Sequence, residues 1–90
     1  MRNASPFDVL ATLPGTLAVA LAKAIARFQE TNLPLEAYTV TVLREGETLI
    51  VTFTDKDAPA GGRGSPGQRP GFEVMLDQKS LTIIESQFIR

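Results

Sequence analysis

The sequence TLAVALAKAIARFQET, residues 16–31, decides the fold, because it is the one long segment with a clear helical pattern. Its apolar residues recur at spacings of three and four, which makes one continuous apolar stripe on an α-helix. The stripe consists of Leu17, Leu21, Ala24, Ile25 and Phe28. We expect Thr16 to cap this helix and Asn32, followed by Pro34, to end it. Strand-like sequence follows, so the helix is predicted to cover a sheet.

A flank of the same helix carries small residues at Ala18, Ala22 and Ala26. Alanine favours the helix and its short side chain permits a close approach to a sheet or to a second helix. We expect this flank to pack inside the monomer. The alternative is a seam between copies, because exposed apolar patches tend to mark contacts.

A short helix is predicted before the main one, from Pro6 to about Thr12. Ser5 is a suitable cap, and proline suits the first helical position because it has no N–H to leave unpaired. Phe7 and Leu10 are expected to point inward. We expect the pair Pro14-Gly15 to break this helix.

The segments 38–44 and 48–54 alternate between apolar and polar residues, which indicates two strands. Gly46 lies between them and permits the positive φ of a tight hairpin turn. A second hairpin is predicted from 72–76 and 81–89, joined by a turn at 77–80. The apolar residues of the last segment change parity, so we expect a bulge near Ile84 and Glu85, or an end covered on both sides.

Residues 55–71, DKDAPAGGRGSPGQRPG, contain five glycines and three prolines and have almost nothing to bury. Loops of this length in compact domains are uncommon unless they are functional or disordered. The predicted fold class is therefore α+β. One main helix packs on a four-stranded antiparallel sheet in a single domain, 1–90, with a long loop at 55–71.

This order resembles the cystatin-like arrangement, which is shared with small bacterial proteins of the nuclear-transport-factor-like fold. The resemblance is carried by ALAKAIARFQE at 20–30, YTVTVLREGETLIVTF at 38–53 and GFEVMLDQKSLTIIES at 71–86. It implies a helix across a curved sheet. It also implies a kinship with immunity proteins that neutralise a toxin delivered between bacterial cells. The hairpin sequence REGE at 44–47 does not match the inhibitory loop of true cystatins, so the resemblance implies no site residues.

Composition excludes several function classes. The chain has 90 residues and a net charge of −1, so no general attraction to nucleic acid or to an anionic membrane is expected. It has no cysteine and no histidine, which excludes disulfides, zinc–sulfur sites and serine–histidine triads. The apolar run at 17–26 is too short for a membrane span and is interrupted by Lys23. We expect a cytoplasmic protein.

Candidate site residues lie in and beside the long loop. The run at 61–67 imitates a phosphate-binding loop, but prolines remove donors and a strand follows where a helix is needed. A protein-binding loop is the better functional interpretation, with Arg63, Arg69, Asp55 and Asp57 as contacts. The alternative is a passive, exposed connection.

Other chemistry has less support. Two carboxylates at 55 and 57 are too few for calcium or magnesium, and their ordinary role is to bond turn backbone; Glu73 and Asp77 add ligands only if the fold brings them near. Glu85, or Tyr38 with Glu36, offers a general acid only in a buried cavity. We predict no catalytic residue, no metal and no cofactor.

The sequence thus favours a non-enzymatic protein-binding module that uses its sheet surface and the 55–71 loop in an immunity-like or inhibitor-like role. One alternative is a self-assembling subunit, a homodimer that pairs through the outer sheet face or the edge of the last strand. Another is a small ligand-binding or enzymatic domain with a pocket between helix and sheet.

Overall fold

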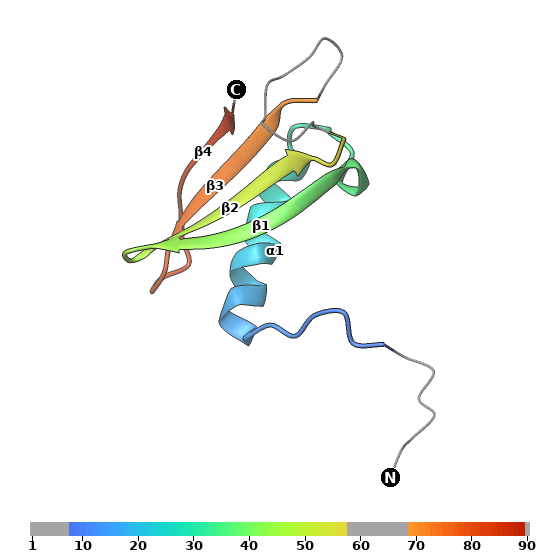
Figure 1. The fold of residues 1–90 in the computed structure, drawn as a ribbon. Helices are drawn as coiled ribbons and strands as arrows, with labels where there is room; N and C mark the ends of the chain where they lie inside the picture. Colours follow the sequence, from blue (N-terminus) through green and yellow to red (C-terminus); the bar gives the residue numbers. More distant parts are fainter. Residues whose placement is uncertain (1–7, 58–68, 90) are drawn as a thin grey trace.

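The computed structural model describes residues 8–57 and 69–89. The elements are α1 (Gly15–Gln29), a short 3-10 turn (Leu35–Ala37), β1 (Tyr38–Glu45), β2 (Thr48–Asp55), β3 (Gly71–Asp77) and β4 (Ile83–Ile89). The four strands form one antiparallel sheet in chain order, and α1 crosses one of its faces (Figure 1). This confirms the predicted α+β class with one main helix and a four-stranded sheet.

The helix α1 begins two residues earlier than predicted, because its cap is Pro14 and not Thr16. Pro14 occupies the cap position with an extended backbone, φ −59° and ψ 147°, and its carbonyl accepts the N–H of Ala18 at 3.0 Å. Thr16 lies within the first turn, so the prediction that it caps α1 is wrong. The predicted end is confirmed, because Asn32 has a φ of 65°, the left-handed conformation that stops a helix.

The core lies between α1 and the middle of the sheet. Phe28 is fully buried and stacks on Phe53, with ring centroids 4.4 Å apart and planes at 10°. The edge of the Tyr38 ring meets it at 4.9 Å. Ala20 and Ala24 are also fully buried, because small residues let the helix backbone approach the strands. The rest of the predicted stripe, at Leu17, Leu21 and Ile25, packs against the core but is only half-buried.

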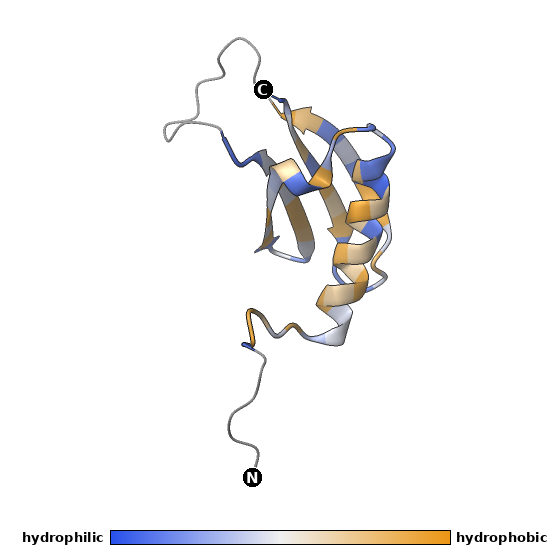
Figure 2. Ribbon diagram, turned by 90° about the vertical axis from the view of Figure 1, so that its right-hand side faces the viewer, coloured by the Kyte–Doolittle hydropathy of each residue, from blue (hydrophilic) through white to orange (hydrophobic). Residues whose placement is uncertain are grey.

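The alanine flank of α1 faces outward. Ala18, Ala22 and Ala26 are all exposed, so the expectation that they pack inside the monomer is wrong. The physical reason is that this architecture has a single helix layer within the described residues. The flank therefore meets no second element, as the side view of the ribbon shows (Figure 2).

Both predicted hairpins are present as antiparallel strand pairs. Glu45 faces Thr48, and the turn between them contains Gly46 with a φ of 63°. In the second hairpin Met75 faces Glu85 while Leu76 faces Ile83, which leaves Ile84 as an extra residue. This bulge confirms the predicted change of parity.

The chain before α1 has no helix over residues 8–14. Val9 and Leu10 are 82% and 94% exposed, so the prediction of a short helix to about Thr12 with Leu10 inward is wrong for this part. Pro6 and Phe7, which belong to the same prediction, lie outside the described residues. A short helix needs tertiary packing to form, and a residue before proline is restricted to extended conformations.

Candidate functional site

The base of the long loop is held by one carboxylate. Asp55 ends β2 and is only 4% exposed. It accepts the backbone N–H of Asp57 at 3.1 Å and that of Arg69 at 3.0 Å. The Arg69 guanidinium lies 3.4 Å from the same carboxylate. The bond from the Asp57 N–H and the bond from the Arg69 N–H hold the pKa of Asp55 below its usual value.

A second contact closes the same end of the sheet. Tyr38, which faces Asp55 in the β1–β2 register, donates its hydroxyl proton to the Pro70 carbonyl at 2.7 Å. The N–H of Lys56 bonds the carbonyl of Ala37 at 3.0 Å. Burial raises the pKa of Tyr38, and the nearby charge of Asp55 raises it further. The two stems of the loop are thus tied to each other and to β1.

These contacts place the predicted partner-binding residues. Asp57 and Arg69 lie side by side, 3.9 Å apart between charged atoms, with side chains 73% and 40% exposed. Asp55 is turned inward and bonds the turn backbone, as Asp commonly does. Arg63 lies outside the described residues. That these residues contact a partner stays a prediction. Of the described ones, Asp57 and Arg69 have exposed side chains, and Asp55 does not.

The remaining acidic residues have local roles or are exposed. Asp77 accepts the backbone N–H groups of Lys79 and Ser80 at 3.1 and 2.8 Å. The bond from the Ser80 N–H, and after it the bond from the Ser80 hydroxyl, lowers the pKa of Asp77. Glu73 accepts a side-chain bond from Gln87 at 2.7 Å. Within residues 8–57 and 69–89, no three acidic side chains gather closely enough to hold a metal ion.

The alternative general acids also lack the required setting. Glu85 lies exposed on the face of the sheet away from α1, and Glu36 is exposed in the 3-10 turn. A general acid at neutral pH needs a buried setting, and neither carboxyl group has one. Tyr38 is buried, but its hydroxyl is engaged with the loop base rather than with a cavity.

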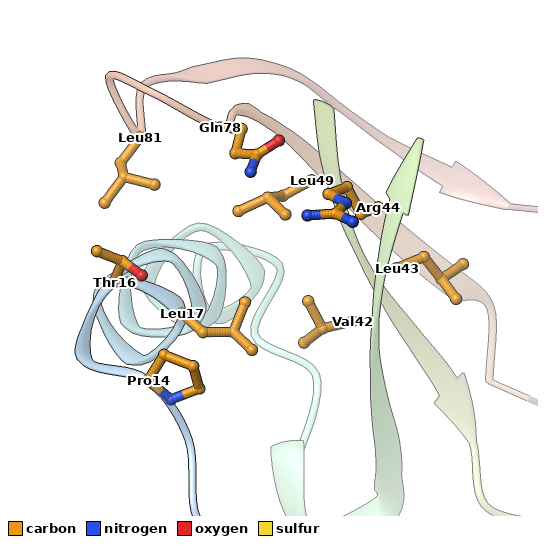
Figure 3. Close-up of a pocket in the computed structure, with 9 residues that line it drawn as sticks. All are labelled: Pro14, Thr16, Leu17, Val42, Leu43, Arg44, Leu49, Gln78 and Leu81. Atoms are coloured by element: carbon orange, nitrogen blue, oxygen red, sulfur yellow. The ribbon is translucent and has the colours of Figure 1, made fainter. Parts of the chain in front are cut away.

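A pocket of about 590 Å³ opens between the first turn of α1 and the turn ends of the two hairpins (Figure 3). Its apolar lining consists of Leu17, Val42, Leu49, Leu81 and Pro14, and its polar lining of Thr16, Arg44 and Gln78. Leu17 and Val42 point toward each other across it, whereas Leu43 points away (Figure 3). We call this the α1–β1 pocket.

The pocket exists because α1 is off-centre on the sheet. The helix packs over β2, β3 and β4. On the helix-facing side of β1, Val42 is therefore half-buried and Val40 is 36% exposed. Apolar side chains of a strand normally face a covering element. Val42 packs against the core on its inner side, so both side chains are covered only in part.

The same strand is an open edge of the sheet. β1 pairs with β2 alone. The turn that joins them has two residues, so the flanking pair Glu45 and Thr48 exchanges hydrogen bonds and the bonding alternates from there. It follows that Val40, Val42 and Arg44 turn their N–H and C=O groups to the free side. The other edge strand, β4, contains the bulge, and bulges commonly protect an edge strand against pairing with another chain. The pairing of β1 is regular, so β1 lacks this protection.

The sheet face opposite α1 has a short apolar row. Leu43, Ile50 and Met75 lie directly opposite one another across β1, β2 and β3. Leu43 is 51% exposed, and threonines and carboxylates flank the row, among them Thr52, Glu73 and Glu85. The exposed apolar surface of β1 therefore continues around its edge, from Val42 on one face to Leu43 on the other.

No family model, no curated protein and no solved structure matches this chain. No helix in the described part of the chain is long and apolar enough to cross a membrane. Function therefore has to be argued from the loop base, the pocket and the open edge.

Sequence reasoning raised a pocket between helix and sheet as an alternative, but it did not identify the residues of the α1–β1 pocket. A usable signal was present, because Val40 and Val42 alternate on one face of the first strand of a meander, and the first strand of a meander lies at an edge. The polar residue Arg44 comes from the end of β1, and Gln78 comes from the turn of the other hairpin. Only the packing of the two hairpin ends beside α1, where the Gln78 N–H bonds the Glu47 carbonyl at 2.8 Å, brings them together.

Proposed function

We propose that the protein is a non-enzymatic protein-binding module that receives an extended apolar segment of a second polypeptide chain along β1. One observation carries this proposal: the residues that present free backbone groups at the edge, Val40 and Val42, also present apolar side chains beside α1 that are covered only in part. In strand addition, backbone bonds supply affinity and side-chain pockets supply specificity. The α1–β1 pocket would take one such side chain.

The chemistry of the pocket supports binding over catalysis. Its polar lining offers a guanidinium, an amide and a hydroxyl, from Arg44, Gln78 and Thr16. Arginine stays protonated, and neither of the other groups accepts a proton near neutral pH. These groups orient a ligand or bond its backbone, and none of them serves as a general base.

The loop at 55–71 forms a second contact in this proposal. The two described stems of this loop lie at the opposite end of the sheet from the pocket, since β2 runs from Thr48 near the pocket to Asp55 at the loop base. Seven residue steps of strand separate the two, or roughly 23 Å. A partner that reaches both must extend along the sheet. An immunity-like or inhibitor-like role in the bacterial cytoplasm, as the cystatin-like resemblance implies, is one form of this function.

A matched pair of variants on one strand tests the proposal. Val42→Glu places a charge in the partly covered apolar surface, whereas Thr41→Glu places it on the exposed opposite face. Displayed libraries of random peptides are selected on the wild-type protein and then measured on both variants. We expect apolar peptides that bind the wild-type and Thr41→Glu proteins and lose at least tenfold in affinity on Val42→Glu. If the selected peptides bind all three proteins equally, the site is elsewhere and the proposal fails.

A further inference from the structure

We infer that the segment received by β1 is residues 8–13 of a second copy of this chain, added as an antiparallel strand. This inference rests on the proposed function and names its partner. It would make the protein a two-fold dimer in which each copy gives one segment and receives one. Exchange of an identical element is a common route to such dimers.

The distribution of exposed apolar side chains supports this pairing. The described residues contain eight large hydrophobic side chains that are exposed: Val9, Leu10, Leu13, Val19, Val40, Leu43, Ile84 and Phe88. Five of the eight lie either in the segment before α1 or on β1. Pairing these two regions would therefore cover most of the exposed large hydrophobic side chains at once. The segment before α1 lacks a partner strand, and β1 lacks a neighbour on its free side.

Charge sets the register. Among the described residues, Arg44 is the one charged side chain that lines the α1–β1 pocket, and Asp8 is the one charged residue in 8–14. Antiparallel pairing with Asp8 opposite Arg44 puts Leu10 opposite Val42 and Val9 opposite Leu43. Opposite charges and apolar pairs that face each other across strands are both stabilising. The segment is long enough, because six extended residues span roughly 20 Å.

The same register excludes the chain's own segment. With Asp8 opposite Arg44, Leu13 lies opposite Thr39, five residue steps or about 17 Å along β1 from Arg44. Pro14 is fixed in the pocket lining together with Arg44, at the other end of that span. Adjacent Cα atoms are only about 3.8 Å apart, so Leu13 and Pro14 of one chain cannot occupy both places. The extended backbone at Pro14 also carries the segment away from the sheet (Figures 1 and 2).

Disulfide trapping tests the inference directly, because the chain has no cysteine of its own. Val9→Cys and Leu43→Cys face each other in the proposed register, and both positions are exposed, so neither change disturbs the core. The full chain with both changes is oxidised mildly and its covalent mass is measured under denaturing conditions. The matched control combines Val9→Cys with Ile84→Cys, an equally exposed position on β4.

We expect a covalent dimer from Val9→Cys with Leu43→Cys and at least tenfold less from the control. A covalently closed monomer overturns the inference, because the segment then folds back on its own chain. Equal yields from both pairs, or no disulfide at all, also overturn it. Sedimentation gives an independent measurement. Asp8→Arg and Arg44→Asp should each weaken the dimer about tenfold, and the double variant should restore it.

The outcomes separate this inference from the proposed function. Leu10→Asp, at a position 94% exposed, should give a folded monomer with an empty edge. If the trapping experiment fails while selected peptides still bind this variant in a Val42-dependent way, only the second-copy inference falls. If trapping fails and no peptide shows that dependence, the proposed function falls as well.

Discussion

The backbone N–H of Arg69 donates to a carboxylate oxygen of Asp55 at 3.0 Å, although fourteen residues separate them in the chain. The other oxygen of that carboxylate accepts the N–H of Asp57. One buried side chain therefore joins the two stems of the long loop, at the end of the sheet where β2 stops and β3 begins.

Replacing Asp55 should loosen this junction. Asp55→Asn keeps one acceptor oxygen but loses the charge and the second acceptor, so we expect a lower thermal midpoint and faster tryptic cleavage after Lys56, at the other stem of the loop. Asp57→Asn is the control, because the Asp57 side chain is 73% exposed and should matter less. The assignment would be contradicted if both variants matched the wild-type protein in thermal midpoint and cleavage rate.

Stability should fall in acid because the folded-state pKa values of Asp55 and Asp77 are lowered. A carboxylate with a lowered pKa stabilises the fold above its unfolded pKa, near 4, and this contribution disappears as the pH falls below that value. Urea unfolding measured from pH 7 down to pH 2 checks the expectation. The Asp55→Asn protein should show a shallower decline below pH 4, since one of the two groups no longer titrates.

Tyr38 should titrate late, because its pKa is raised by burial and by the charge of Asp55. It is the one tyrosine in the chain, and there is no tryptophan, so the ultraviolet absorbance of tyrosinate reports it directly. A raised pKa means that its contribution to stability is present below pH 10 and is lost as the pH rises above that value. Titration of the folded protein with a midpoint at or below 10 would contradict this.

Tyr38 packs its ring in the core and bonds the loop base through its hydroxyl, and removing the hydroxyl separates these two roles. Tyr38→Phe keeps the ring beside Phe28 but removes the bond to the Pro70 carbonyl. We expect a loss of about 0.5–1.5 kcal/mol in the free energy of unfolding, the usual contribution of one hydrogen bond. Chemical denaturation measures it. A loss above about 3 kcal/mol would instead indicate a rearranged core.

The core should depend most on Phe28, which is fully buried and contacts three aromatic rings. We expect Phe28→Ala to cost about 3–5 kcal/mol in the free energy of unfolding, through lost burial and the cavity left behind. Val19→Ala, on the same helix at 47% exposure, should stay within about 0.5 kcal/mol. Similar losses for the two variants in denaturant titrations would contradict the packing described above.

Much of the fold could be predicted from local patterns. The spacing of Leu21, Ala24 and Phe28 indicates one helix, and the period of two around Val51 indicates strands, because each pattern matches the geometry of its element. The turn at Gly46, the helix end at Asn32 and the bulge near Ile84 were predicted correctly. Each of these features has a local physical cause.

The errors share a different cause. Thr16 is a good cap residue, and the segment from Pro6 to about Thr12 starts like a helix, but local preference is weak where no packing supports it. The alanine flank of α1 was expected inside because its pattern does not say how many layers the domain has. The partner-binding residues were chosen by residue type, and burial then separated Asp55 from Asp57.

The sequence by itself determined the helix, the strands, their order and the length of the loop between β2 and β3, because these follow from backbone preferences and the alternation of apolar side chains. The tertiary structure alone decided where α1 lies on the sheet. Helix position depends on how Ala20, Ala24 and Phe28 fit against Phe53 and Phe72, a property of volumes from distant segments. That off-centre position leaves Val40 and Val42 covered only in part, and so creates the site proposed for this protein.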